Sequence, residues 1–150
     1  MSLDLAQVVE LLDLEELEVN IFRGYSPPEE RERAFGGQVA AQALVAAMRT
    51  VPDDRVVHSL HSYFLRPGDV MAPIVYFVDR IRDGKSFTTR RVVAIQHGEA
   101  IFELSASFHR GEGGVDHHLP MPSAPDPETL PTLQERLHAM YGAKVPERII

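Results

Sequence analysis

The sequence predicts an α+β protein in which an antiparallel β-sheet wraps around one long central helix, at about residues 36–51. The first observation is that the run after Gly36 and Gly37 consists almost entirely of alanine, valine, leucine and methionine. A helix that is apolar nearly all round is one that protein encloses. The second observation is that four strand-like segments follow Pro52, with no further helix among them. Those segments are expected to form the enclosing sheet.

The composition of the predicted helix suits a buried element. Alanine is the best helix former, and its short side chain lets a sheet approach closely. The run is too short to cross a bilayer and contains Gln38, Gln42 and Arg49, so we expect no membrane span. Pro52 has no backbone donor and is expected to end the helix. Leu44→Asp is expected to abolish folding, because it would bury an unpaired charge.

The segment before this helix is expected to contain a shorter helix and one strand. Apolar residues at helical spacing occupy 3–12, after Ser2 as a candidate N-cap, and this helix is expected to lie over one end of the sheet. Residues 17–23 alternate between apolar and polar side chains, which predicts one strand that closes near Gly24. The proline-led charge run at 26–33 predicts a solvated connector, with a lid over a pocket as the alternative.

Four strands rich in β-branched and aromatic residues are expected after the central helix. They cover residues 56–66, 73–81, 86–96 and 100–108. The pairs Asp83-Gly84 and His97-Gly98 are typical of tight hairpin turns, so we expect an antiparallel meander in which the strand at 86–96 is central. A long buried helix followed by such a meander is the pattern of the hotdog fold.

Two histidines lie in the first of these strands. Alternation places His58 and His61 on opposite faces of the sheet, unless a bulge intervenes. An imidazole beside a cavity can accept a proton from water near neutral pH, which makes His58 a weak candidate for a catalytic group. Histidines within apolar strands are more often satisfied structural residues. The histidine spacing indicates no metal site, and the lack of Gly-x-Ser-x-Gly disfavours a serine hydrolase triad.

The composition excludes several classes of protein. The net charge of -7 argues against a nucleic-acid partner, because phosphate backbones require clustered lysine and arginine. The absence of cysteine removes disulfides, thiolate metal sites and a cysteine nucleophile. The amino terminus lacks the pattern of a secretory signal. These features together predict a cytoplasmic protein without a membrane partner.

The character of the chain changes after His109. Residues 111–131 are rich first in glycine and then in proline, which predicts an extended linker that follows a domain at 1–110. Residues 132–150 resume a helical pattern and then begin an apolar run. We expect this part to be a helix and the start of a second hotdog domain that the chain does not contain.

Four segments in order resemble the amino-terminal half of the acyl-CoA thioesterase II family. They are Phe35–Val39 (FGGQV), His58–Asp69 (HSLHSYFLRPGD), Arg82–Phe87 (RDGKSF) and Met121–Pro125 (MPSAP). The resemblance implies a tandem double-hotdog hydrolase of lipid metabolism that converts fatty acyl-CoA to free fatty acid and coenzyme A, without a metal or a covalent cofactor. It also implies that the family's catalytic Asp, Thr or Ser, and Gln lie in the second hotdog, beyond Ile150, so that no catalytic residue belongs to this chain.

Chemistry suggests what this half contributes to a substrate site. The amino end of a buried helix offers backbone N–H groups and partial positive charge to an oxygen that gains charge, so Gly36, Gly37 and Gln38 are candidate substrate-binding residues. The alternative is that the glycines only permit a tight entry into the helix. Gln38 and Gln42 either share a polar stripe along a cavity or bind a loop or second subunit.

Coenzyme A carries phosphates, so a basic rim is expected. Arg66 is the candidate, with Lys85, Arg90 and Arg91 as others; each alternatively neutralises carboxylates on adjacent strands.

Two functions remain open. The chain is either the non-catalytic half of an acyl-CoA thioesterase, which docks a second hotdog domain, or a stand-alone hotdog that binds acyl-CoA or a partner protein without catalysis. Homo-oligomers are expected, because open sheet edges favour pairing. A hotdog dehydratase ranks low, because residues 38–48 contain no carboxylate to assist a catalytic histidine.

Overall fold

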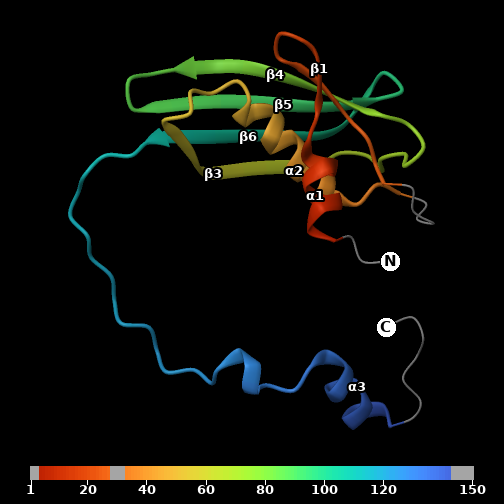
Figure 1. The fold of residues 1–150 in the computed structure, drawn as a ribbon, viewed down its shortest axis with the longest axis vertical. Helices are drawn as coiled ribbons and strands as arrows, with labels where there is room; N and C mark the ends of the chain where they lie inside the picture. Colours follow the sequence, from red (N-terminus) through yellow and green to blue (C-terminus); the bar gives the residue numbers. More distant parts are fainter. Residues whose placement is uncertain (1–3, 28–32, 143–150) are drawn as a thin grey trace. The chain divides into compact units, whose positions relative to one another are not determined.

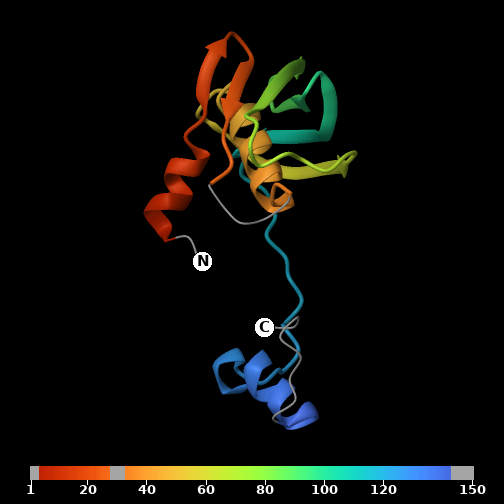
Figure 2. The same cartoon turned by 90° about the vertical axis from the view of Figure 1, so that its right-hand side faces the viewer.

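The computed structural model describes residues 4–27 and 33–142 (Figure 1). The elements are α1 (Leu5–Leu12), β1 (Glu15–Glu18), β2 (Ile21–Gly24), α2 (Gly36–Met48), β3 (Arg55–Phe64), β4 (Ile74–Asp83), β5 (Phe87–Gln96), β6 (Glu99–Arg110), η1 (Pro127–Thr129) and α3 (Leu133–Tyr141). The chain divides into two compact units, Met1–Gly113 and Gly114–Ile150. All the strands belong to the first unit, and α2 lies across one face of their sheet (Figure 2).

The sheet has six antiparallel strands in the order β1-β2-β4-β5-β6-β3. The predicted interior position of β5 is confirmed. The predicted simple meander is wrong at β3, which pairs with β6 instead of β4. The physical reason is the connection between β3 and β4, which contains Pro67 and Pro73 and has no tight hairpin turn. Pairing with β6 sets Leu60 opposite Ala106 and leaves β3 at one edge.

The amino-terminal part contains a hairpin where the sequence predicts one strand. β1 and β2 pair with each other across a turn at Val19 and Asn20. Asn20 has φ 63°, a left-handed conformation that asparagine tolerates better than most residues. The single strand at 17–23 is therefore wrong, and the polar Asn20 marks the turn that divides it.

The central helix α2 begins at Gly36 as predicted but ends at Met48, before the predicted end at residue 51. Tight backbone bonds replace the helical ones there: Thr50 N donates to Ala47 O at 3.1 Å and Val51 N to Met48 O at 3.1 Å. The helix thus stops before Pro52 is reached.

The sheet covers one face of α2. The buried residues of the helix are Gln38, Val39, Gln42, Ala43, Ala46 and Ala47. Their spacing is that of a single helical face. Met48 is 48% exposed, so the prediction that protein encloses the helix all round does not hold within this unit. The three alanines are fully buried, and their small side chains meet a core of strand residues that includes Tyr76, Phe102, Leu104 and Phe108.

The helix α1 is capped by Asp4, whose side chain accepts a hydrogen bond from Gln7 N at 2.8 Å. The predicted cap, Ser2, lies outside the described residues. We expected α1 over one end of the sheet, but its contacts are mainly with α2. There, Gln42 Nε2 donates to Leu11 O at 2.8 Å.

The two predicted hairpin turns have different outcomes. His97 (φ 50°) and Gly98 (φ 80°) form the tight turn between β5 and β6, as predicted. The hairpin predicted at Asp83-Gly84 is also present, because β4 and β5 pair antiparallel there. Its tight two-residue form is wrong, because Gly84 does not adopt a positive φ and β5 begins only at Phe87. Gly84 serves close packing instead, since a Cβ there would lie 2.8 Å from Phe87 O.

The second unit holds exposed backbone and one described α-helix. Residues 111–126 form no helix or strand, and η1 and α3 follow. Thr132 caps α3, as its Oγ1 accepts from Glu135 N at 3.2 Å. The helical pattern predicted from residue 132 is thus present, whereas residues 143–150 lie outside the described part. No helix in the described residues is long and apolar enough to cross a membrane.

Candidate functional site

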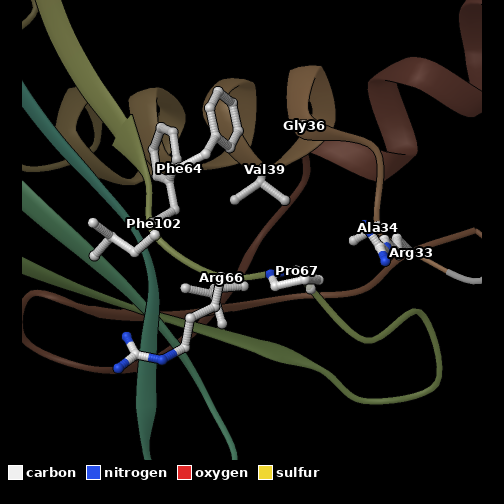
Figure 3. A pocket seen from close by; sticks show the side chains of 11 residues that line it. Arg33, Ala34, Gly36, Val39, Phe64, Arg66, Pro67 and Phe102 are labelled. Carbon is white, nitrogen blue, oxygen red and sulfur yellow. The ribbon is translucent and has the colours of Figure 1, made fainter.

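A pocket of about 390 Å³ opens at the amino end of α2 (Figure 3). Its lining comes from the approach to α2, the start of α2, the segment after β3, and β6. These residues are Arg33, Ala34, Gly36, Val39, Phe64, Leu65, Arg66, Pro67, Gly68, Ile101 and Phe102. Two of the four residues predicted to bind substrate, Gly36 and Arg66, therefore meet in one cavity. Its described lining contains two arginines and no carboxylate, which favours an anionic ligand.

The first turn of α2 begins at this pocket, where Gly36 belongs to the lining and Gly37 does not. Phe35 is the N-cap residue, and its carbonyl accepts hydrogen bonds from Gln38 N at 3.0 Å and Val39 N at 3.2 Å. The N–H groups of Gly36 and Gly37 have no hydrogen-bond acceptor among the described residues. Free N–H groups and the partial positive charge at a helix amino end suit an oxygen that carries negative charge.

The glycines at this turn also allow close packing of aromatic rings. A Cβ at Gly36 would lie 2.9 Å from the ring of Phe64, and a Cβ at Gly37 would lie 2.6 Å from the ring of Phe35. The geometric role and the donor role therefore coexist at Gly36, because its missing side chain admits Phe64 while its N–H stays at the pocket.

The side chains of Gln38 and Gln42 point elsewhere. Gln38 Nε2 donates to Tyr25 O and to Ser26 Oγ, both at 3.1 Å. Gln42 Nε2 donates to Tyr25 O at 3.1 Å, and Gln42 Oε1 accepts from the Tyr76 hydroxyl at 2.7 Å. Burial raises the pKa of that hydroxyl well above its usual range. Both glutamines thus bind the segment after β2, as in the alternative in which they hold a loop instead of lining a cavity.

Arg66 lines the pocket but turns its guanidinium toward β6 (Figure 3). Its Nε lies 2.6 Å from Glu99 Oε2, and its Nη1 donates to Ala100 O at 2.7 Å. The side chain is 49% exposed, so the ion pair is solvated and weak. These contacts match the alternative interpretation, in which Arg66 neutralises a carboxylate on a neighbouring strand. If Arg66 were released from Glu99, its guanidinium would be free to bind a phosphate.

A residue that sequence reasoning missed, Gln96, holds the segment between β3 and β4. Gln96 is 4% exposed; its Nε2 donates to Asp69 O at 2.9 Å and to Ala72 O at 2.8 Å, and its Oε1 accepts from Asp69 N at 2.8 Å. Next to it, Gly68 O accepts from Ala34 N at 2.8 Å. These bonds fix one pocket wall to the entry of α2. The signal in the sequence that could have identified Gln96 is that it is a polar residue on the buried face of β5.

Asp69 gives this wall a dependence on pH. A hydrogen bond from the Met71 backbone and, secondly, one from His97 hold the pKa of Asp69 below its usual range. Because the folded protein favours the carboxylate, its stabilising effect is present above the unfolded pKa and is lost as pH falls through the folded pKa. We expect Asp69→Asn to lower the melting temperature at pH 6 and to have progressively less effect as the pH falls below the usual pKa range of aspartate. Melting curves over that range test this, and a constant difference would contradict it.

His58 lies away from the pocket, on the sheet face opposite α2. A bulge between Val57 and Ser59 breaks the alternation of β3. His58 Nε2 is 2.9 Å from Ser107 Oγ, and its ring lies edge-on to Phe87 and to His109. The bulge also places His61 on this face, so the exception allowed for a bulge applies and the two histidines share one face. No group of three or more His, Cys, Asp and Glu in the described residues could hold a metal ion.

An antiparallel sheet across one central helix, with a pocket at the amino end of that helix, defines a hotdog-fold protein. A protein of unknown function with a hot dog fold from Alicyclobacillus acidocaldarius has a similar structure, with a TM-score of 0.67 and 27% identity over 86% of this chain and 49% of that one. The family model of the acyl-CoA thioesterase N-terminal domain matches residues 26–109. The chain belongs to the acyl-CoA thioesterase family.

Two relatives show the extent of the similarity. An acyl-CoA thioesterase 2 from Haemophilus influenzae is 41% identical over 97% of this chain and 55% of its own length. A crystal structure of an acyl-CoA thioesterase II, TesB2, from Mycobacterium marinum has a TM-score of 0.75 and 53% identity, and covers 87% of this chain and 49% of that one. The chain thus spans about half the length of the relatives it matches.

Proposed function

We propose that this chain is the amino-terminal, non-catalytic half of an enzyme that hydrolyses fatty acyl-CoA to free fatty acid and coenzyme A. The single observation that carries the proposal is the pocket at the amino end of α2, in a chain whose family is that of acyl-CoA thioesterases. The half-length match to relatives supports a second hotdog domain, which would begin in the part of the chain from residue 132.

Hydrolysis adds a water oxygen to the thioester carbonyl, forms a tetrahedral oxyanion, and then breaks the C–S bond as the sulfur leaves and is protonated. Groups that activate the water are expected in the second domain. This chain would supply backbone N–H donors at Gly36 and Gly37 to the oxygen that gains charge. Apolar side chains, among them Val39, Phe64 and Phe102, would line the acyl chain. No metal or covalent cofactor enters this scheme.

The edge strand β3 is the place where we expect the second domain to dock. Apolar side chains on this side of the unit remain open to solvent: Leu60 is 50% exposed, Phe64 is 63% exposed and Met48 is 48% exposed. A second hotdog would bury this surface, and the pocket would then lie at the boundary between the two halves. Pairing of such double units into a homo-oligomer, and a cytoplasmic location, complete the proposal.

An activity assay on two lengths of the polypeptide tests the assignment. We expect a product that continues beyond Ile150 to hydrolyse a medium-chain acyl-CoA, and the 150-residue chain to show no turnover. Release of the thiol, followed with a chromogenic disulfide, measures both. Turnover by the short chain would contradict the non-catalytic role.

The alternative is a stand-alone hotdog that binds acyl-CoA or a partner protein without turning it over. It would be favoured if neither length hydrolysed the thioester while both bound a non-hydrolysable thioether analogue. The free N–H groups of Gly36 and Gly37 could serve binding as well as catalysis. Binding of the thioether analogue is therefore measured together with thioester hydrolysis.

A further inference from the structure

We propose that a second pocket of the sheet-bearing unit, at the carboxyl end of α2, binds the phosphoryl group of a small anionic ligand. The pocket has a volume of about 350 Å³. Its polar lining is dominated by guanidinium groups and hydroxyls. The residues that matter are Arg49, Thr50, Arg55, Arg80, Asp83 and Arg90. The site is separate from the pocket at the amino end of α2, because the two lie at opposite ends of this 13-residue helix, roughly 20 Å apart.

Arg90 forms a rigid, charged floor for this pocket. It is 1% exposed, and every one of its nitrogens has a partner. Its Nε donates to Thr50 Oγ1 at 2.8 Å, and its Nη2 donates to Thr50 O at 3.0 Å and to Asp83 Oδ1 at 2.6 Å. The guanidinium charge of Arg90 thus lies just beyond the carboxyl end of α2, where it offsets part of the negative potential that would otherwise repel an anion. Asp83 is the one carboxylate in the described lining, and Arg90 already binds it.

Arg55 carries an unmet donor. Its Nη1 donates to Thr88 Oγ1 at 2.9 Å and its Nη2 to Lys85 O at 3.0 Å, which fixes the guanidinium plane. Its Nε, however, is the one buried side-chain nitrogen or oxygen of the described chain without a hydrogen-bond partner, and Asp54 Oδ1 is 3.8 Å away. A buried donor without a partner destabilises the folded protein, so this nitrogen favours an added acceptor.

Carboxylates balance three of the four arginines in the lining. Arg49 pairs with Asp13 at 2.6 Å, Arg90 pairs with Asp83 at 2.6 Å, and Arg55 Nε lies 3.8 Å from Asp54 Oδ1. Arg80 has no carboxylate partner in the described part of the chain, and its Nε donates to the neutral Asn20 Oδ1 at 2.7 Å. Four arginines and one carboxylate therefore line a single cavity in a chain of net charge -7. A phosphoryl group offers three strong acceptor oxygens, which match several guanidinium donors, whereas a cation would be repelled.

Calorimetric titration with inorganic phosphate at constant ionic strength tests the site. We expect the purified protein to bind phosphate, and both Arg80→Gln and Arg55→Gln to weaken binding at least tenfold. Arg80 is exposed, so its replacement leaves the fold intact. Arg91→Gln is the matched control, because Arg91 is the next residue of β5, pairs with Glu103 at 2.9 Å and lies on the opposite face. Its phosphate affinity is expected to stay unchanged.

Two outcomes would overturn the proposal: no binding beyond that of chloride, or equal weakening in the Arg91→Gln control. A second arm separates free phosphate from a nucleotide as the source. If adenosine 3′,5′-bisphosphate binds more tightly than phosphate and loses this affinity in Arg80→Gln, the ligand is a nucleotide. If it binds no more tightly, the ligand is phosphate itself. Neither arm uses thioester hydrolysis, so failure here leaves the proposed function untouched.

Discussion

Ala43→Asp is expected to abolish cooperative folding of the sheet-bearing unit. Ala43 is fully buried on the face of α2 that meets the sheet, and the described residues of its core cluster are apolar, so none of them could pair with a carboxylate. An unpaired buried charge costs several kcal/mol, which is comparable to the whole stability of about 5–15 kcal/mol that a domain has. Circular dichroism and thermal melting measure the loss. A soluble variant that melts cooperatively near the wild-type temperature would contradict the packing of α2.

Leu44→Asp is the matched comparison, one residue further along the same helix. From the sequence alone Leu44 is the position expected to abolish folding. In the structure it is only half-buried at the margin of the core, so its new carboxylate reaches water more easily. We therefore expect a smaller loss than for Ala43→Asp. The reverse order would mean that the buried face of α2 is misassigned.

Gln42→Leu is expected to destabilise the unit by roughly 3 kcal/mol, because it removes the side chain that three other groups share as a hydrogen-bond partner. Gln42 is fully buried and binds Leu11 O, Tyr25 O and the Tyr76 hydroxyl. Leucine has a similar volume, so the loss reports the abandoned hydrogen bonds and not a cavity. Urea unfolding gives the change in the free energy of unfolding.

Tyr76→Phe serves as the control for this network. It removes one of the three bonds and leaves Gln42 Oε1 without its donor, so we expect a cost of about 1–2 kcal/mol, smaller than for Gln42→Leu. Equal costs for both variants would show that the bonds from Gln42 to Leu11 and Tyr25 contribute nothing, and would contradict the role of Gln42 as the anchor of the amino-terminal segment.

Much of the fold follows from local sequence signals. The glycine pair and the alanines predict the start of α2, and His97-Gly98 predicts the turn that makes β5 and β6 neighbours. The pairing of β3 with β6 escapes such reasoning, because local signals specify only strands joined by tight turns. A bulge has no side-chain signature of its own, and the one between Val57 and Ser59 reverses the faces of the residues that follow it, His61 among them.

The candidate site is predictable in part for a related reason. Gly36 and Arg66 were expected from chemistry, and both line the pocket. Gln38 was expected for its position, but the direction of its side chain depends on carbonyl groups in the segment after β2, which only tertiary structure supplies. Gln96 and the arginine pocket depend on contacts between distant elements, and single-sequence patterns do not reveal such contacts.

The irregularity in β3 limits what the open margin of the sheet can accept. An incoming strand needs an uninterrupted ladder of peptide groups, and the extra residue at His58 breaks that ladder near the start of β3. Only the stretch from Ser59 to Phe64 offers a continuous template. These six residues are enough to pair with a partner domain that has a short edge strand. They are a poor template for the repeated strand addition that builds fibrils.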